Sequence, residues 1–521
     1  MMRLNLDRHW EYTESTLAST FSVLNPDISW KRIDLPHDAV IGIERKEEYL
    51  SGADEGFFPG VSLFYKKELF IDEGFRNKRL ILEFEGVMGI SEIFVNGVLV
   101  HKHYYGYTSF LVDITEVIKI NEKNIILVHV DTTAKPSSRW YAGAGIYRHV
   151  WLHVGEDLYI KPWGLQVMSQ ILDNQMTLLK IKAEIKNYFK ERINGKILFQ
   201  VLDSEDKIIE EKYEDFSINE KEEKQVYSEM VLKDFILWDL DNPYLYMARA
   251  ILLLDGKEVD ESSVNFGIRK IELNPKEGFK LNGRVIKLKG GCIHHDNGIL
   301  GSASYDRAEE RKVEILKQNG FNAIRTAHNP YSPSFLEACD RLGMLVIEEF
   351  FDAWTGGKRA FDFHLYFDKY WEEEIENTIK RDFNHPSIII WSIGNEITWG
   401  AGVDPEDEKS YSSIHFWTKK LAEKVRELDP TRFITQAFCH FIFEYEDNVE
   451  MVEENGVVYR KIKREVNRER DRWGEITEKM CRYLDIAGYN YKHERYGYDY
   501  ENYPSRVICG TETFPYTLFD S

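Results

Sequence analysis

The stretch IIIWSIGNEI, residues 388–397, decides how the second half of this chain is expected to fold. Its first residues are almost all apolar and rich in isoleucine, which is typical of a strand buried on both faces of a parallel sheet. The apolar run ends abruptly at Gly394, Asn395 and Glu396. A buried strand that finishes on a carboxylate needs a reason, so Glu396 is either a polar strand end or one half of a catalytic pair.

A pattern of buried strands extends on both sides of this stretch, from about residue 275 onward. Short apolar runs alternate with amphipathic helical patterns, and the strand candidates are VIKLKGGC, FNAIRTAH, MLVIEEF, SIIIWSIGNE, RFITQAF, LDIAGYNY and RVICGTE. Repeated alternation of strand and helix predicts a parallel sheet. Seven strands in one direction favour a (β/α)8 TIM barrel over residues 274–521 rather than an open sheet.

A barrel of this kind needs an eighth strand, and the sequence does not supply one. The chain ends at Ser521, just after the seventh strand candidate. The long, highly charged segment at 440–480 is expected to hold a helical excursion between the fifth and sixth strands. We therefore expect the chain to be a fragment of a longer protein. The alternatives are a complete but degenerate protein that binds sugar without turnover, and a barrel completed by a partner chain.

The first half of the chain is strand-rich and lacks convincing helices. Residues 1–158 carry short alternating patterns such as SEIFVNGVLV, in which Asn96-Gly97 is a hairpin turn signal, and they predict a β-sandwich. Residues 159–273 continue with patterns such as MTLLKIKAEIKNY over a length that suits an immunoglobulin-like sandwich. The expected fold class is therefore multidomain, with two β-sandwiches followed by a TIM barrel that lacks its last strand.

Bulk composition argues against several classes of function. The formal net charge is -21, so the surface repels phosphate backbones and nucleic-acid binding is not expected. The five cysteines include no pair with CxxC spacing, which argues against a zinc site and a disulfide framework. Reduced thiols, the lack of a signal-peptide h-region and the lack of an apolar run of membrane-spanning length together predict a cytoplasmic protein that does not bind membranes.

Most strand candidates of the barrel end in chemically capable side chains, and the active sites of such barrels lie at those ends. The carboxylates among them are Glu348, Glu349, Glu396 and Glu512. Paired carboxylates suggest glycoside hydrolysis, in which one acid protonates the leaving oxygen and a second serves the anomeric carbon. Glu396 and Glu512 end the fourth and seventh strands, nearly across the barrel from each other. Glu348 and Glu349 are adjacent on a strand, so at most one of them faces the barrel interior.

Motifs along nearly the whole chain occur in an order that points to one enzyme family. They are LPHD (35–38), NGVLVHKHYYGYTSF (96–110), SSRWYAGAGIYRHVWL (137–152), LWDLDNPYLY (237–246), FGIRKIELNPKEGFKLNGRVIKLKGGCIHHDNG (266–298), FNAIRTAHNPYSPSFLEACDRLGMLVIEEFFDAW (321–354), RDFNHPSIIIWSIGNE (381–396), DIAGYNY (485–491) and CGTET (509–513). Together they resemble glycoside hydrolase family 2, the family of β-galactosidases, β-glucuronidases and β-mannosidases. The resemblance implies a jelly-roll, sugar-binding-like fold for residues 1–158.

The resemblance also implies catalytic roles. Glu396, in the Asn-Glu pair that ends the fourth strand, corresponds to the acid/base, and Asn395 would hydrogen-bond the sugar 2-hydroxyl. Glu512, in GTET on the seventh strand, corresponds to the nucleophile. The implied mechanism is double displacement with retention, through a covalent glycosyl-enzyme.

Further substrate-binding positions are carried over by the same resemblance. They are His295 after the first strand, His328 after the second, Arg325 as the residue that orients the nucleophile, Tyr491 (or Tyr489) after the sixth strand, Arg139 and Trp140 in the SSRWY loop of the first domain, and Trp354 in FDAW. The loop with Arg139 and Trp140 is equally well explained by domain packing. Trp354 is either a sugar platform or a core residue.

Departures from the family pattern limit the finer conclusions. Some relatives bind Mg²⁺ through a Glu and a His after the third strand, but FFDAWTGG shows no such ligands, so no metal or other cofactor is expected, although Mg or Na occurs in the family. The carboxylate-reading motif of glucuronidases would lie beyond Ser521. The expected partner is a carbohydrate and the expected activity is that of a β-galactosidase, with homo-oligomers known among relatives. A β-glucuronidase and a non-catalytic carbohydrate-binding protein are the alternatives.

Overall fold

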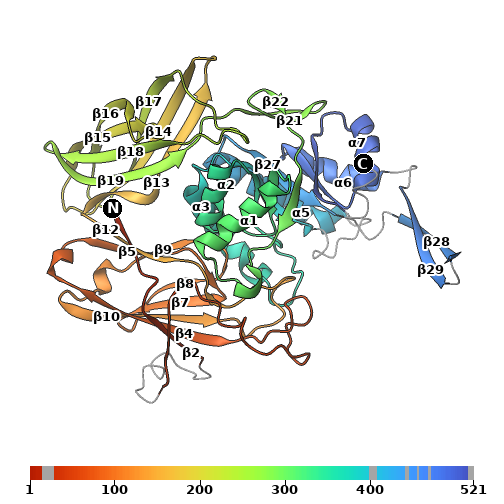
Figure 1. The fold of residues 1–521 in the computed structure, drawn as a ribbon, viewed down its shortest axis with the longest axis horizontal. Coiled ribbons are helices and arrows are strands. Elements are labelled where there is room, and N and C mark those ends of the chain that lie inside the picture. The colour runs from red at the N-terminus through yellow and green to blue at the C-terminus, as the bar shows by residue number, and fades with distance from the viewer. Residues whose placement is uncertain (15–27, 398–407, 440–444, 455–456, 467–470, 514–521) are drawn as a thin grey trace.

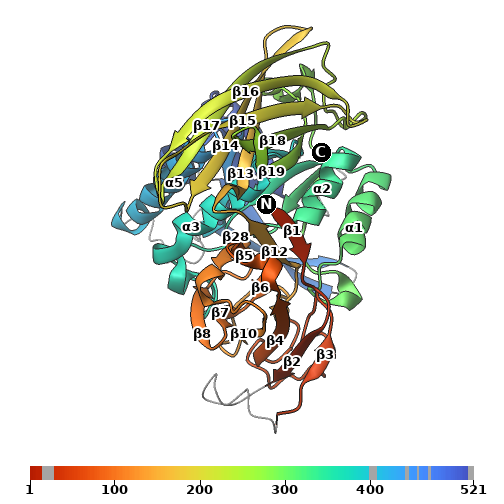
Figure 2. The same cartoon turned by 90° about the vertical axis from the view of Figure 1, so that its left-hand side faces the viewer.

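The computed structural model describes residues 1–14, 28–397, 408–439, 445–454, 457–466 and 471–513. Figure 1 shows two β-sandwiches, in red to orange and in yellow to light green, beside a green-to-blue barrel. Figure 2 shows the sandwiches one above the other, with the N-terminus between them. None of the described helices is long and apolar enough to cross a membrane. The predicted fold class is confirmed.

The first sandwich packs a four-stranded sheet against a six-stranded sheet around its own apolar core. The first sheet has the order β1 (Met2–Asn5), β12 (Val150–Gly155), β5 (Arg79–Phe84) and β9 (Phe110–Asp113). The second has the order β3 (Lys31–Ile33), β2 (Trp10–Glu14), β4 (Ser62–Ile71), β10 (Glu122–Asp131), β7 (Ile90–Val95) and β8 (Val98–His103). Asn96 and Gly97 join β7 to β8 with φ values of 51° and 83°, as expected for the predicted hairpin turn.

The second sandwich is immunoglobulin-like, with three strands facing four. One sheet contains β13 (Leu158–Ile171), β14 (Met176–Asn187) and β17 (Glu223–Lys233). The other has the order β16 (Ile208–Ile218), β15 (Ile193–Leu202), β18 (Tyr246–Leu254) and β19 (Lys257–Phe266). Alternate residues of β14 are buried along its whole length, because the alternation of apolar and polar side chains matches the pleat of the strand.

The described part of the barrel contains seven parallel strands in chain order, as predicted. They are β23 (Gly290–Ile293), β24 (Ala323–Thr326), β25 (Leu345–Glu349), β26 (Ile388–Asn395), β27 (Phe433–Phe438), β30 (Ile486–Asn490) and β31 (Ile508–Glu512). The sheet curls until its two outer strands meet, where Sγ of Cys292 lies 3.2 Å from the carbonyl oxygen of Thr511. A small sheet of β20 (Ile271–Asn274), β21 (Gly278–Leu281) and β22 (Arg284–Val285) precedes the barrel and packs on apolar residues of its strands.

Helices cover the outside of the barrel between its strands, as the alternation of strand and helix predicts. They are α1 (Asp306–Gln318), α2 (Pro333–Leu342), α3 (His364–Asp382), α5 (Glu408–Leu428), α6 (Arg472–Cys481) and α7 (Tyr496–Asn502). The start of α2 shows how the sequence sets these limits. Ser332 accepts a hydrogen bond of 3.4 Å from the backbone N–H of Phe335, and Pro333 occupies the first helical position.

The described part of the charged segment at 440–480 differs from the predicted structure. The expected helical excursion begins as an antiparallel hairpin of β28 (Tyr445–Glu454) and β29 (Val457–Val466), which projects from the body in Figure 1, and only then continues into α6. Among the residues that the structure describes, these two strands pair with each other and not with the barrel sheet, as expected for a segment that supplies no eighth strand. The Asn455-Gly456 dipeptide, followed directly by the β-branched Val457 and Val458, is the overlooked sequence signal.

The first sandwich is docked firmly on the barrel. Tyr105 and Trp140 belong to the same buried apolar cluster as the barrel residues around Phe350. The hydroxyl of Tyr105 donates a hydrogen bond of 2.7 Å to the carbonyl oxygen of Phe350, which directly follows β25. The guanidinium of Arg148 donates a bond of 2.9 Å to the carbonyl oxygen of Pro330, in the loop after β24. The first sandwich therefore reaches the end of the barrel at which the strands finish.

Candidate active site

Glu396 directly follows β26, at the mouth of the barrel. Every residue of β26 is buried, as predicted for a strand covered on both faces. Glu396 is 8% exposed and has a left-handed backbone with a φ of 43°, which turns the chain away from the strand. Gly394 allows the turn to pack closely, because a Cβ at this position would lie 2.7 Å from Nε1 of Trp354. The end of IIIWSIGNEI is thus a tight turn that places a carboxylate at the barrel mouth.

Glu512 is the last residue of β31, and three side chains surround its carboxylate. Nη1 of Arg325 donates a bond of 2.8 Å, the hydroxyl of Tyr491 donates another, and Nε2 of His328 lies 3.6 Å away. Burial acts to raise the pKa of Glu512, but Arg325, His328 and the Tyr491 hydroxyl outweigh it and leave this pKa below its usual value. Glu512 is therefore held as an anion.

Asn490, the last residue of β30, connects the two carboxylates. Its Nδ2 lies 3.2 Å from Oε1 of Glu396 and 3.0 Å from Oδ1 of Asn395. Its Oδ1 accepts a bond of 2.7 Å from the hydroxyl of Thr511, the neighbour of Glu512. The carboxylates that the sequence pairs thus belong to one hydrogen-bonded network at the ends of β26, β30 and β31. Asn490 was not predicted as a site residue, and its place at the end of a barrel strand is the sequence signal that could have found it.

Glu349 lies beneath this network and is fully buried. Its Oε2 accepts bonds from Nη2 of Arg325 at 2.7 Å and from Ser392 at 2.5 Å. Its Oε1 lies 2.6 Å from Nδ1 of His328. Arg325 also donates 3.0 Å to Oδ1 of Asn395. Glu349 therefore anchors Arg325 and His328, the two side chains that face Glu512, a role that the sequence did not assign to it.

Glu348 points to the other side of β25, as the alternation of a strand requires. Its Oε1 accepts a bond of 3.3 Å from the backbone N–H of Tyr331 and lies 4.0 Å from Arg381, away from Glu512. Burial, followed by the nearby Asp382, raises the pKa of Glu348 to about 8. Only one residue of this adjacent pair thus faces the barrel interior.

Asp352 is a second site residue that the sequence did not single out. Its carboxylate accepts bonds from Arg139 at 2.7 and 3.0 Å, from Nζ of Lys358 at 2.7 Å and from Nδ2 of Asn395 at 2.9 Å. Burial opposes its ionisation, but Lys358 and Arg139 hold the pKa of Asp352 well below its usual value. Because Arg139 comes from the first sandwich, Asp352 ties that domain to Asn395. The FDAW motif contains both Asp352 and Trp354, but only Trp354 was predicted to be a site residue.

Trp140 also reaches the barrel mouth from the first sandwich. Its ring stacks on His294 with a centroid distance of 5.0 Å and meets His328 edge-on at 5.5 Å. A cavity of about 50 Å³ beside these residues is lined by Arg139, Trp140, His328 and Asp352 among others. The SSRWY loop is therefore both a packing loop and part of the wall around the carboxylates.

His295, which was predicted to bind substrate, lies elsewhere. It is buried between Tyr107 and Tyr147, and its Nε2 lies 3.1 Å from the carbonyl oxygen of Ala142. Burial lowers its pKa well below the usual value, so the ring is neutral. Its neighbour His294 instead lies beside Trp140 and His328. Of the two histidines in HHD, the structure therefore places His294, and not His295, beside the residues around Glu512.

Trp354 is a core residue in this structure, not a platform. It is 1% exposed, and its Nε1 donates a bond of 2.9 Å to the carbonyl oxygen of Ile393. The choice left open between Tyr489 and Tyr491 is also resolved. The hydroxyl of Tyr489 is buried against Asp499 at 2.5 Å, whereas that of Tyr491 donates to Glu512. Arg325, His328, Asn395, Arg139, Trp140 and Tyr491 are thus brought together with the two glutamates.

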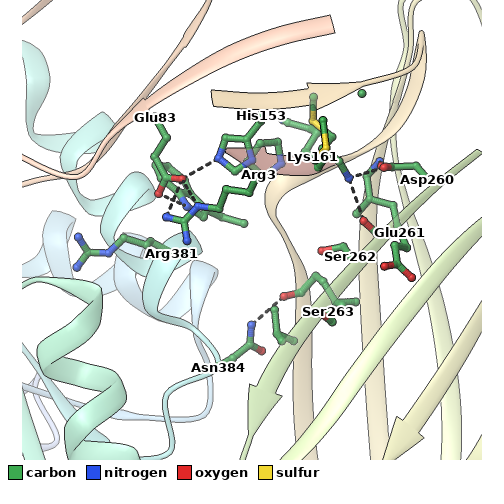
Figure 3. Close-up of a pocket in the computed structure, with 18 of the residues that line it drawn as sticks. Arg3, Glu83, His153, Lys161, Asp260, Glu261, Ser262, Ser263, Arg381 and Asn384 are labelled. Atoms are coloured by element: carbon green, nitrogen blue, oxygen red, sulfur yellow. Dashed lines mark hydrogen bonds and ion pairs between the residues drawn. The ribbon is translucent and has the colours of Figure 1, made fainter. Parts of the chain in front are cut away.

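A much larger cleft, of about 1030 Å³, lies away from this network, where the two sandwiches meet α3. Figure 3 shows Arg3, Glu83 and His153 on one side of it and Asp260 to Ser263 on the other. Glu83 contacts Arg3 and His153 at 3.1 and 2.7 Å, all three on neighbouring strands of the first sandwich. The described residues contain no group of three or more His, Cys, Asp or Glu side chains arranged to hold a metal ion.

Comparison with known families matches three consecutive segments of the chain. Residues 52–155 match the family model for the glycosyl hydrolases family 2 sugar binding domain, and residues 159–269 match the model named glycosyl hydrolases family 2. Residues 271–467 match the model for the TIM barrel domain of the same family. All three matches name one family, in the order in which its domains occur along this chain.

Individual relatives agree with the family matches. A β-galactosidase, BoGH2A, of Bacteroides ovatus is 36% identical over 78% of this chain and 51% of its own length. A putative β-glucuronidase of Formosa agariphila is 33% identical over 77% of this chain and 39% of its own length. The crystal structure of a glycosyl hydrolase family 2 member from Bacteroides cellulosilyticus superposes with a TM-score of 0.86 at 33% identity, covering 99% of this chain and 62% of that one. The chain thus spans about half the length or less of these curated relatives.

Proposed function

Because this chain belongs to glycosyl hydrolase family 2, we propose that it is a retaining exo-β-glycosidase that hydrolyses terminal β-D-galactosides. The observation that carries the proposal is the hydrogen-bonded connection of Glu512 to Glu396 through Arg325, Asn395 and Asn490 at the barrel mouth. Two carboxylates in one polar network at the strand ends are what double displacement requires.

The environments of the two carboxylates support different roles. Arg325 and Tyr491 keep Glu512 ionised, so Glu512 is the nucleophile that attacks the anomeric carbon. The bond between that carbon and the aglycone oxygen breaks as Glu396 gives its proton to the oxygen. Glu396 then removes a proton from water, whose oxygen displaces Glu512 from the anomeric carbon. The sugar is released with its configuration retained after two inversions.

The remaining side chains bind and orient. The amide of Asn395, fixed by Arg325, Asn490 and Asp352, is the proposed partner of the sugar 2-hydroxyl. Trp140 and His294 form a stacked wall beside His328, which suits the apolar face and the hydroxyls of a sugar ring. Together these groups define a site for one terminal sugar.

The galactoside preference is supported by the relative named as a β-galactosidase and by the local charges. Arg139 and Lys358, the cations bonded to Asp352, are already engaged with that carboxylate, which favours an uncharged sugar over a uronate. The second candidate is a β-glucuronidase. Several relatives at similar identity carry that name.

A panel of nitrophenyl β-glycosides on the whole protein separates these candidates. We expect turnover of the galactoside with retention of configuration, observed by NMR of the first-formed sugar. Glu512→Gln and Glu396→Gln should each abolish turnover of this substrate. Glu348→Gln is the matched control, because Glu348 lies next to Glu349 on β25 but faces away from the site, and burial raises its pKa and so favours the neutral form that Gln mimics. Faster turnover of the glucuronide would contradict the galactoside preference, and binding without hydrolysis would favour a carbohydrate-binding protein.

A further inference from the structure

We propose that Lys358 is a positioning residue that fixes the peptide bond between Asn395 and Glu396, and so sets the direction of the acid/base carboxylate. The inference rests on the proposed function of Glu396. Lys358 lies in the loop between β25 and α3, and neither the sequence motifs nor the family matches single it out. Its role is read from what its ammonium group contacts.

The ammonium group of Lys358 is buried and donates hydrogen bonds to two acceptors. Its side chain is 1% exposed. Nζ donates one hydrogen bond of 2.7 Å to Oδ1 of Asp352 and another of 2.8 Å to the backbone carbonyl oxygen of Asn395. An ammonium group is costly to remove from water, so it stays buried only where acceptors of this kind compensate it. The position of the charge is therefore determined by these two contacts.

The carbonyl of Asn395 and the N–H of Glu396 belong to one peptide unit, and both are held. Lys358 binds the carbonyl, and the N–H donates 2.9 Å to the carbonyl oxygen of Ala437 on β27. Glu396 has a φ of 43°, in the left-handed region that side chains other than glycine rarely adopt. Such a conformation persists only where the surroundings fix it. Lys358 supplies one of the two contacts that do so on this peptide.

The loop that carries Lys358 is itself anchored on the first sandwich. The backbone N–H groups of Lys358 and Arg359 donate 2.7 and 2.8 Å to Oδ2 of Asp362. The guanidinium of Arg359 forms an ion pair with Asp54, and the N–H of Phe361 donates 3.1 Å to the carbonyl oxygen of Pro136. Displacing this loop would therefore change the turn at Glu396, which gives the first sandwich a mechanical influence on the reaction.

The test compares Lys358→Met with the whole parent protein, and Lys369→Met serves as the control because Lys369 is an exposed lysine on α3. Loss of a charged hydrogen bond predicts a fall in kcat of roughly 10- to 150-fold. KM should stay near the parent value, because Lys358 contacts backbone and Asp352 rather than the sugar. Ethylamine added to Lys358→Ala should restore part of kcat, since it returns an ammonium group to the vacated place.

A second readout does not depend on turnover. Hydrogen exchange of a peptide spanning residues 388–397 should be faster in Lys358→Met than in the parent and unchanged in Lys369→Met. A parent that hydrolyses no β-glycoside but shows this exchange difference would refute the proposed function and support the positioning role. An active parent whose Lys358→Met variant keeps both kcat and the parental exchange would refute the positioning role alone.

Discussion

Replacing Tyr491 by phenylalanine removes one hydrogen bond from the proposed nucleophile and leaves the rest of the site in place. The hydroxyl of Tyr491 donates to Glu512, and burial together with this carboxylate raises the pKa of Tyr491, so it stays a donor at all working pH values. Hydrogen bonds to charged groups contribute about 1.5–3 kcal/mol, and one pKa unit corresponds to 1.36 kcal/mol. Because the Tyr491 ring is only partly buried, the lower part of this range applies, and the pKa of Glu512 should rise by about 1 unit.

The sign of the effect follows from the role of Glu512. A nucleophilic carboxylate must be ionised, so activity falls as the pH drops through its pKa, which the native site holds below the usual value. In Tyr491→Phe this loss should begin at higher pH. The acidic limb of the kcat/KM profile therefore moves up by about 1 unit, while the alkaline limb stays in place.

The assay is the pH dependence of kcat/KM for nitrophenyl β-galactoside, and Tyr489→Phe is the matched control. Tyr489 lies two residues away, but its hydroxyl binds Asp499 on the outside of β30. The control should lose stability without moving the acidic limb. An unchanged limb in Tyr491→Phe, or an equal shift in Tyr489→Phe, would refute the assignment of Glu512 as a nucleophile stabilised by Tyr491.

The remaining predictions concern stability and binding. Glu374 accepts a hydrogen bond from Thr108 at the sandwich–barrel interface, where burial raises the pKa of Glu374 well above its usual value. The contribution of Glu374 to folding stability is therefore fully present below the unfolded pKa of about 4.3 and is lost as the pH rises toward the folded value. Glu374→Gln should therefore raise the thermal midpoint at pH 8 but not at acidic pH, and an equal gain at both would contradict this account. His294→Ala should lower kcat/KM at least about tenfold, whereas His295→Ala should mainly lower the thermal midpoint, because only His294 lies beside the proposed sugar site. Trp354→Phe should cost about 1–3 kcal/mol in urea unfolding and leave KM unchanged, and a raised KM would return Trp354 to the sugar site.

The barrel could be predicted from the sequence because its signals are local. Runs such as residues 388–393 are too apolar to be anything but buried, and the amphipathic segments between them are long enough to be helices. The hairpin at 445–466 was missed because charge was taken as evidence for a solvated helix. Its β-branched residues and its Asn-Gly dipeptide were the better guide, since backbone preference acts whether or not the side chains are charged.

The carboxylate pair could be predicted for a different reason. Glu396 directly follows β26 and Glu512 ends β31, so their place at the barrel mouth is fixed by the fold. Lys358 and Asp352 lie in an irregular loop, whose path depends on contacts with the first sandwich that no local pattern encodes. The exchange of His294 for His295 has a similar cause, because β23 ends before both and adjacent residues face different surroundings.

Covalent trapping tests the central assignment most directly. A β-galactoside that carries fluorine at C2 and a good leaving group should form the glycosyl-enzyme faster than water can clear it. Digestion and mass spectrometry of the inactivated protein should then find the sugar on the peptide that contains Glu512, at the end of β31. A label on Glu396 or Glu349, or inactivation without a covalent adduct, would contradict the account.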